Sequence, residues 1–236
     1  MASCGILTAS LSACQSTEQE SAQIGRQSQR QAPATGALKL GARNGAVHIS
    51  HVTLLAHEGR LAVAAELTST SPRAQRDVPI LVTVTGKHGE TLYSNAAGGL
   101  EPSLQRIALL RAHQSAWWVD DQVLVTGAAT SAHVEVGAGA RVTTRSPAQP
   151  LTRAVHADSQ AGVATIAATL LNSSAEALTK IAVFGVALRR GLIVAAGRAV
   201  IASLAGRASA AFQIVLVGQA TGAKIALSAI PGGSGG

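Results

Sequence analysis

Asp120 and Asp121 form the one pair of adjacent acids in the 236-residue chain, so acid–base chemistry is the first function to test. Paired carboxylates can serve as general acid and base when both reach one substrate. The flanking residues favour a strand, however, in which successive side chains point to opposite faces. Asp77 and Glu101 are further acids, but nothing in the sequence brings them close to this pair. The pattern therefore predicts no catalytic residues.

Histidine spacing and glycine loops give no cofactor signal either. His48 and His51 lie three residues apart on an expected strand, which places them on opposite faces and prevents shared metal ligation. Gly137 and Gly139 start a dinucleotide-binding pattern, but Val142 stands where its third glycine belongs. We expect a non-enzymatic protein with no cofactor and no metal site.

Both tryptophans lie in the segment SAWWVDDQVL, residues 115–124, beside the acid pair. Only one of Trp117 and Trp118 can face a sandwich core, because strand side chains alternate. An internal alignment with Phe212 turns Trp118 inward, whereas the apolar alternation through Trp117 and Val119 turns the other ring inward. Both registers stay open. The outward ring would form a candidate binding surface, or would pack against another part of the chain; the surface comprises Trp117, Trp118, Asp120 and Asp121.

The chain has a formal charge of +7, and its second half carries most of the excess. Residues 150–236 hold two acids, Asp158 and Glu176, against seven Lys and Arg side chains. Arg189 and Arg190 fall at an expected hairpin turn, where they are candidate contacts for an anionic polymer or protein. Aromatics make up only 2% of the chain, so we expect no nucleic-acid partner.

The elements that hold these side chains are predicted to be β-strands. Apolar residues alternate with small or polar ones over residues 61–67 and 78–84, the period of half-buried strands. Glycine, proline and polar turn residues separate the alternating segments. About seven strands are expected between residues 46 and 136, the number of an immunoglobulin-like β-sandwich.

The same order of segments recurs further along the chain. GRLAVAAELTSTSPRAQRDVPILVTVTGKHG from Gly59 aligns with GVATIAATLLNSSAEALTKIAVFGVALRRG from Gly162, and IALLRAHQSAWW from Ile107 aligns with IASLAGRASAAF from Ile201. We interpret the order as a tandem duplication with an insertion in the first copy at residues 96–105. The fold class predicted is all-β, with two tandem immunoglobulin-like β-sandwich domains. Their expected bounds are 38–142 and 151–231, with a linker over 143–150 and a flexible tail over 232–236.

The second repeat resembles the FxLYD-type immunoglobulin-like domains of bacterial surface lipoproteins. The resemblance rests on a strand ending in Asn172-Ser173-Ser174, the strand from Ile181 to Leu188, a glycine turn, and a last hairpin with Phe212. It covers about 80 residues and implies the sandwich fold, but Arg189-Arg190 stands where the family has a Tyr-Asp pair. The role of that family is itself mostly unassigned.

Residues 2–13 are small or apolar and carry no charge, as in the hydrophobic part of a signal peptide. Leu11-Ser12-Ala13-Cys14 resembles the bacterial lipobox at all four positions. The resemblance implies a signal peptide over residues 1–13, lipidation at Cys14, and a tether over 14–37. No Lys or Arg precedes the apolar stretch, so we favour an upstream start codon; a buried Cys14 or a Cys4–Cys14 disulfide are the alternatives.

Together these patterns predict an exported lipoprotein anchored to the membrane in the bacterial envelope. Its expected function is that of a structural or interaction module, with the membrane as partner through the lipid and an anionic envelope polymer or protein as the second partner. The alternative is a lipoprotein that binds a ligand or substrate at the surface from Trp117 to Asp121. An accessory domain of an envelope enzyme ranks third.

Overall fold

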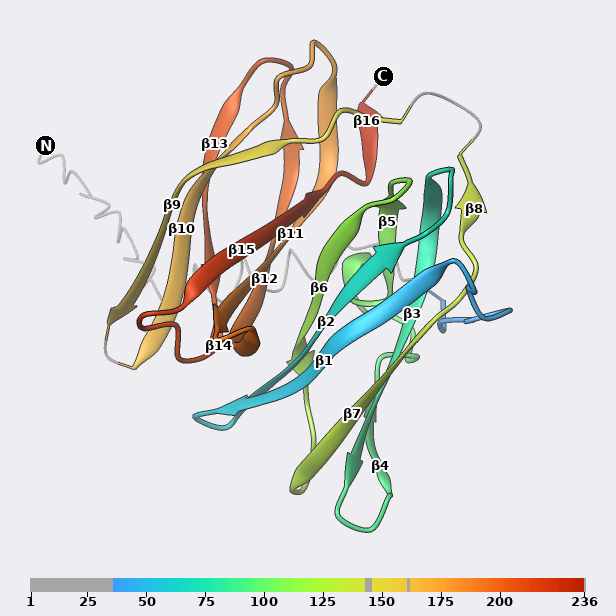
Figure 1. Cartoon of the computed structure of the whole chain (residues 1–236), viewed down its shortest axis with the longest axis vertical. Coiled ribbons are helices and arrows are strands. Elements are labelled where there is room, and N and C mark those ends of the chain that lie inside the picture. Colours follow the sequence, from blue (N-terminus) through green and yellow to red (C-terminus); the bar gives the residue numbers. More distant parts are fainter. Residues whose placement is uncertain (1–35, 143–145, 161, 236) are drawn as a thin grey trace, which may run out of the picture. The chain divides into compact units, whose positions relative to one another are not determined.

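The computed structural model describes residues 36–142, 146–160 and 162–235 (Figure 1). These residues fold almost entirely into antiparallel strands, so the predicted all-β class is confirmed. The described residues contain one short 3-10 helix, and within them no helix is long and apolar enough to cross a membrane. The predicted signal peptide, Cys14 and tether up to residue 35 lie outside the described residues.

The first half of the chain forms two sheets. One has the order β1-β2-β6, and the other is built on β3, which pairs with β4, β5, β7 and β8. The 3-10 helix η1 falls between β4 and β5, inside the predicted insertion. The bounds are β1 (Val47–His57), β2 (Arg60–Ser69), β3 (Gln75–Gly86), β4 (Thr91–Ser94), η1 (Pro102–Leu104), β5 (Arg106–Leu110), β6 (Ser115–Val123), β7 (Ala129–Val136) and β8 (Ala140–Arg141).

The second half repeats this arrangement. One sheet has the order β13-β10-β9, and the other has the order β14-β12-β11-β15, with β16 also paired to β11. The bounds are β9 (Leu151–Gln160), β10 (Val163–Leu171), β11 (Ala177–Arg189), β12 (Leu192–Leu204), β13 (Ser209–Val215), β14 (Val217–Gly218), β15 (Lys224–Ile230) and β16 (Gly233–Gly235). The long strand β12 takes the place of both β4 and β5, because this half has no insertion.

The pairing registers of the two halves coincide, which supports a tandem duplication. Trp118 pairs with Ala65 in the first half, and Phe212 pairs with Ala168 at the matching position in the second. Both aromatic side chains are buried. Of the two registers left open by the sequence, the structure thus adopts the one that aligns Trp118 with Phe212.

Backbone irregularities repeat as well. Of the eight described non-glycine residues with positive φ, six form matching pairs, which are His51 with Ala154, Asp77 with Lys180, and His113 with Arg207. The first pair lies where the strand register shifts by one residue, the geometry of a β-bulge, and the second pair lies where one paired position is skipped without a change of register. Bulges are conserved features of a fold rather than accidents, so their recurrence argues that both halves follow one plan.

The buried apolar residues form two clusters, and one of them contains residues of both halves. Phe184 and Val186 of β11 belong to the cluster that also holds Trp118 and Val119 of β6. Alternate residues of the same strand, such as Val183, join the other cluster inside the second sandwich. The described residues belong to one compact unit. The boundary between two separate domains therefore stays a prediction.

The carboxyl end of the chain differs from the prediction. Residues 232–236 were expected to be a flexible tail, but Gly233–Gly235 forms β16 against Ala177–Thr179 of β11. Strand pairing uses backbone groups alone, so three small residues can add to an open stretch of a longer strand. The predicted linker contributes Ser146–Pro150 to the described residues, without regular structure.

Candidate functional site

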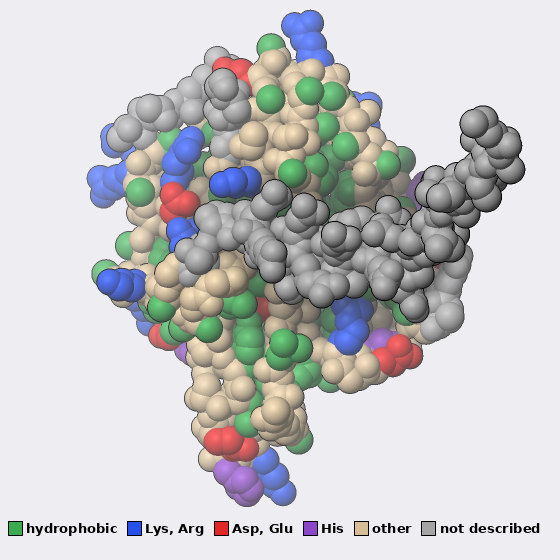
Figure 2. Space-filling model, turned by 180° about the vertical axis from the view of Figure 1, so that it is seen from behind, with side chains coloured by type: hydrophobic (Ala, Val, Ile, Leu, Met, Phe, Trp, Pro, Cys, Tyr) green, Lys and Arg blue, Asp and Glu red, His purple; other side chains and the backbone are tan. Residues whose placement is uncertain are grey.

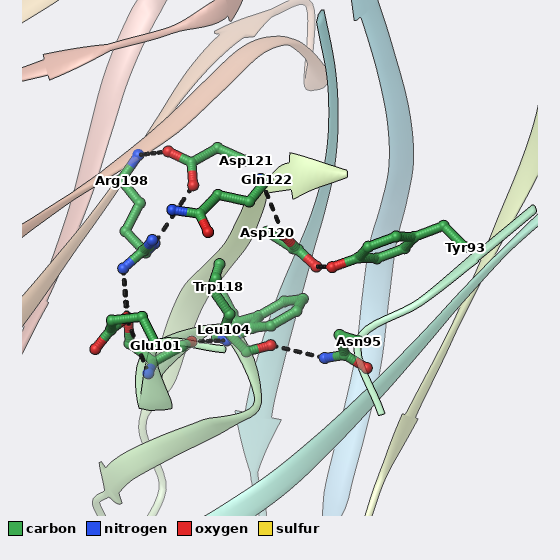
Figure 3. A network of polar contacts seen from close by, with 10 residues as sticks. Tyr93, Asn95, Glu101, Leu104, Trp118, Asp120, Asp121, Gln122 and Arg198 are labelled. Atoms are coloured by element: carbon green, nitrogen blue, oxygen red, sulfur yellow. Dashed lines mark hydrogen bonds and ion pairs between the residues drawn. The ribbon is translucent and has the colours of Figure 1, made fainter. Parts of the chain in front are cut away.

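The structure places three of the residues predicted for a binding surface, Trp118, Asp120 and Asp121, in the interior rather than on the outside. Trp118 and Asp120 are fully buried, Trp117 is half-buried, and the Asp121 side chain is 13% exposed. Arg189 and Arg190 are exposed, and they lie far along the sequence from the acid pair. The segment from Trp117 to Asp121 instead contributes to contacts within the first half and between the two halves (Figure 3).

Asp120 points into the first sandwich, where it meets Tyr93 of β4. The Tyr93 hydroxyl donates a hydrogen bond to Asp120 Oδ2 at 2.7 Å, and the Gln122 backbone N–H donates to Oδ1 at 3.1 Å. Burial raises the pKa of the Asp120 carboxyl to about 6, although both hydrogen bonds act in the opposite direction. Burial and the nearby carboxylate of Asp120 raise the pKa of Tyr93 well above its ordinary range.

Asp121 points the other way, toward β12 of the second half. Its Oδ2 accepts the backbone N–H of Arg198 at 3.2 Å, and its Oδ1 lies 3.4 Å from Arg198 Nε. The two adjacent acids therefore face different sides of β6, as expected from strand alternation. They cannot act together on one substrate atom.

Arg198 connects the acid pair to the predicted insertion. Its Nη1 lies 2.5 Å from Glu101 Oε2 and donates to Ser103 Oγ at 2.8 Å. The Ser103 carbonyl in turn accepts the indole N–H of Trp118 at 2.8 Å. The Arg198 side chain is only 6% exposed, so its charge is balanced by Glu101 and Asp121 in a largely dry environment. The name polar clamp is used below for Glu101, Ser103, Asp121 and Arg198.

An apolar contact surrounds the clamp. Ala62 and Ala64 of β2 and Val119 of β6 have no exposed surface, although they lie on the outer face of the first sandwich. The Trp117 backbone N–H donates to Ser228 Oγ of β15 at 2.9 Å across the same contact. The β1-β2-β6 sheet is therefore covered by the second half, whose contribution is Ala182, Phe184, Val186, Ile193, Ala196, Val217 and Ile230.

The matching face of the second half remains open. In β10 and β13, Ala167 and Gln213 take the positions of Ala64 and Val119, as their register shows. Gln213 is exposed and Ala167 is half-buried, and a shallow depression lies over them. The polar Gln213 in place of Val119 indicates that the two equivalent faces differ: the face of the first half is covered, and the face of the second half is exposed to solvent.

The Arg189-Arg190 turn is the predicted site residue pair that the structure leaves accessible. Arg190 and Gly191 join β11 to β12 and both have positive φ, at 51° and 81°. This is the backbone of a two-residue hairpin turn, in which glycine relieves the strain. The Arg189 guanidinium donates to the Thr221 carbonyl, and Lys224 pairs with Leu188 beside it. On the face that Figure 2 shows, Lys and Arg side chains are scattered, and several of them lie beside acidic side chains.

Within the described residues, no three His, Cys, Asp or Glu side chains cluster in a way that could hold a metal ion. His51 lies 3.8 Å from Glu66 through its Nε2, and its ring is 6.0 Å from that of Trp117. The bulge at His51 turns this side chain toward the outer face of the first half's β1-β2-β6 sheet, beside Glu66 and Trp117. Cys14 lies outside the described residues.

Sequence reasoning missed Tyr93, Ser103 and Arg198. Glu101 was considered as a distant partner of the acid pair, and it does approach Asp121, but only through Arg198. The insertion in the first repeat interrupts the internal alignment at the position of Arg198. The comparison of the repeats therefore gave no signal for this residue. The usable signal was the low content of charged residues, 13%. An acid that is buried in such a chain requires a cation or a hydrogen-bond donor beside it, so a partner for the acid pair could have been sought.

The sequence matches no protein-family model and no curated protein. The resemblances to lipoproteins and to FxLYD-type domains therefore remain predictions.

Proposed function

We propose that this protein is a non-enzymatic interaction module of the bacterial envelope, held at the membrane by a lipid on Cys14. The observation that carries the proposal is which polar side chains are buried in contacts within the protein and which are exposed. Asp121 is engaged in holding the two halves together and Asp120 is buried against Tyr93 in the first half, whereas the Arg189-Arg190 turn is exposed. A compact body with an exposed pair of arginines at one turn suits presentation of a contact site better than turnover of a substrate.

The partner proposed for this turn is an anionic polymer or an acidic protein surface of the envelope. Arginine binds phosphate and carboxylate groups through paired hydrogen bonds. Two arginines on a fixed hairpin turn lose little backbone conformational entropy when they bind such groups. The turn backbone is fixed by β11 and β12, so the basic groups are positioned by the fold rather than by a loop.

Membrane anchoring is tested by the mass of the amino-terminal peptide isolated from native membranes. A mature peptide that begins at Cys14 and carries a diacylglyceryl group supports export and anchoring. An unmodified peptide that begins at Met1, recovered from a soluble fraction, removes the anchor from the proposal.

The binding role is tested with purified cell-wall and envelope fractions. The double variant Arg189→Ala with Arg190→Ala is expected to lose most of the bound protein relative to the unsubstituted chain, with the loss greatest at low salt. Lys87→Ala is the matched control, because Lys87 lies at the equivalent turn of the first half, which also carries Glu90. Equal binding by the double variant and the control contradicts the role of the basic turn.

A further inference from the structure

Leu192 is a large apolar side chain that the fold leaves in solvent. It is the first residue of β12, and 69% of its surface is exposed. It pairs with Arg189 across the β11-β12 hairpin, and directly paired residues share one face of the sheet. Arg190 and Gly191 complete the turn, and all four residues are exposed. An exposed leucine therefore lies beside two arginines at the end of one hairpin.

A third base lies next to this hairpin. Lys224 begins β15, is exposed, and pairs with Leu188, the residue before Arg189. None of the ion pairs within the described residues involves Lys224, Arg189 or Arg190. The Arg189 guanidinium donates to the Thr221 carbonyl, which leaves its other N–H donors and its charge without an acidic partner. The three cations are therefore available to an external anion.

Acidic side chains are sparse around these bases. Residues 186–193, VALRRGLI, and residues 219–224, QATGAK, contain no Asp or Glu. Asp158 lines a hollow together with the loop from Ala220 to Ala223, and the three bases outnumber this one acid. The name basic-apolar tip is used below for Arg189, Arg190, Leu192 and Lys224. The tip combines an excess of positive charge with one exposed apolar side chain.

The size and chemistry of the basic-apolar tip favour a lipid bilayer over a folded partner. A stable protein interface buries about 800 Å² and about 20 residues on each side, which is far more than a four-residue tip offers. An anionic bilayer instead attracts Lys and Arg to its surface and accepts an apolar side chain at the boundary of its acyl chains. A bilayer also requires no matching shape. Bases that surround one exposed leucine meet both of its requirements.

We propose that the basic-apolar tip docks on an anionic lipid bilayer, with its three bases at the lipid phosphates and Leu192 inserted at the boundary between head groups and acyl chains. Strand pairing fixes the hairpin backbone, so docking orders little of the chain. The inference rests on the proposed function, because the lipid on Cys14 keeps the tip near a membrane, and it extends the partners of the basic turn to that membrane. Contact at a second point sets the orientation of the body relative to the bilayer.

Vesicle co-sedimentation tests the charged part of this contact. The probe is the full chain with Cys4→Ser and Cys14→Ser, so that neither lipid nor thiols attach it to a vesicle. It should bind vesicles of mixed phosphatidylglycerol and phosphatidylcholine, and not vesicles of phosphatidylcholine alone. The triple variant Arg189→Glu, Arg190→Glu, Lys224→Glu should bind the anionic vesicles about tenfold or more weakly, because each base near such a surface contributes roughly a fivefold gain in affinity.

A charge-matched control separates the tip from the general basicity of the chain. The triple variant Arg153→Glu, Lys180→Glu, Arg207→Glu changes the net charge equally, at three exposed positions outside the tip. Arg207 lies in the turn that follows the other end of β12. This control should keep most of the vesicle binding. Equal loss in the two triple variants overturns the proposal, as does an unsubstituted chain that does not bind the anionic vesicles. Circular dichroism checks that each variant is folded.

Insertion of the apolar side chain is measured with Leu192→Trp. Anionic vesicles should shift the emission of the introduced indole to shorter wavelength, and brominated lipids should quench it. The unsubstituted chain supplies the background of Trp117 and Trp118. The control is Leu151→Trp, at a position that is 47% exposed at the start of β9, and it should show neither effect. An emission spectrum of Leu192→Trp that the anionic vesicles leave unchanged overturns the inference.

The vesicle experiments also separate this inference from the proposed function. Lipid vesicles contain neither wall polymer nor protein, so they report on the bilayer alone. Suppose that the vesicles do not bind the chain, whereas envelope fractions bind it and lose it on Arg189→Ala with Arg190→Ala. The basic turn then has a polymer or protein partner, and the bilayer inference alone is wrong.

Discussion

At the residue scale, Asp120 is a carboxyl group that folding removes from water. Its pKa rises from 3.8 to about 6 because burial disfavours the charged form. The folded state therefore holds its proton more tightly than the unfolded chain does. The associated stability is fully present below pH 4 and is lost as the pH rises through about 6. The shift corresponds to about 3 kcal/mol.

We expect Asp120→Asn to remove this pH dependence. The amide keeps the shape of the carboxyl group and can still accept the Tyr93 hydroxyl, but it has no charge to desolvate. The free energy of unfolding of the variant should exceed that of the wild type above pH 7, and the difference should shrink toward pH 4. Denaturant unfolding across this range measures it. A difference that stays constant with pH contradicts the burial argument.

Tyr93 is predicted to hold Asp120 partly in its ionised form. Its hydroxyl hydrogen bond lowers the pKa of Asp120 against the effect of burial. Tyr93→Phe should therefore move the pH midpoint of the stability profile upward, and should cost about 1–3 kcal/mol at neutral pH because the buried carboxylate loses a donor. Titration of the Asp120 carboxyl carbon by NMR checks the direction. An unchanged midpoint would show that this hydrogen bond does not stabilise the carboxylate.

At the element scale, β12 carries the cation of the polar clamp, Arg198. Replacing Arg198 with Met keeps the apolar volume but leaves Glu101 and Asp121 without the cation that both of them contact. We expect a loss of about 2 kcal/mol in the free energy of unfolding, below the value for a fully buried pair because Glu101 is 35% exposed. Arg207→Met, at an exposed position, is the control.

A double-mutant cycle separates the interaction energy of Glu101 with Arg198 from the contribution of side-chain packing. Glu101→Gln should cost less in the Arg198→Met background than in the wild type, because the interaction has already been removed. Independent, additive losses would show that Glu101 and Arg198 do not stabilise the fold through their ion pair.

The strands themselves could be predicted from the sequence. Apolar alternation and the internal alignment predicted the order of elements, the inserted segment and the inward position of Trp118 in one of two open registers. Which outer sheet face is covered by another part of the chain could not be predicted. Ala64 and Ala167 are the same residue type at equivalent places, yet one is buried by the second half and the other is half-buried. Periodicity reports which side of a strand is apolar, but it does not report what covers the other side.

Arg198 shows the same limit for the candidate site. Its contacts join residues nearly a hundred positions apart, and no local pattern marks a long-range ion pair. The binding surface expected between Trp117 and Asp121 rested on local composition alone. Adjacent aromatic and acidic residues looked like a ligand surface because the sequence does not show that β12 and β15 lie against them.

At the scale of the whole molecule, the contact between the halves predicts how the protein unfolds. One apolar cluster contains Val119 of the first half and Phe184 of the second, so unfolding either half exposes core of the other. The described unit should therefore unfold in a single cooperative transition. Calorimetry and denaturant titration should agree on one midpoint.

A substitution at the covered face should break this coupling. Ala64→Arg forces a charged, bulky side chain into a site with no exposed surface, and we expect it to separate the halves at a cost above about 3 kcal/mol. Unfolding should then occur in two transitions, or in one of lower denaturant dependence. Ala167→Arg makes the same change at the equivalent open face and should cost less than about 1 kcal/mol, because the new side chain extends into solvent. If both variants keep a single transition of wild-type steepness, the halves are coupled by something other than this face, and the clamp alone must hold them.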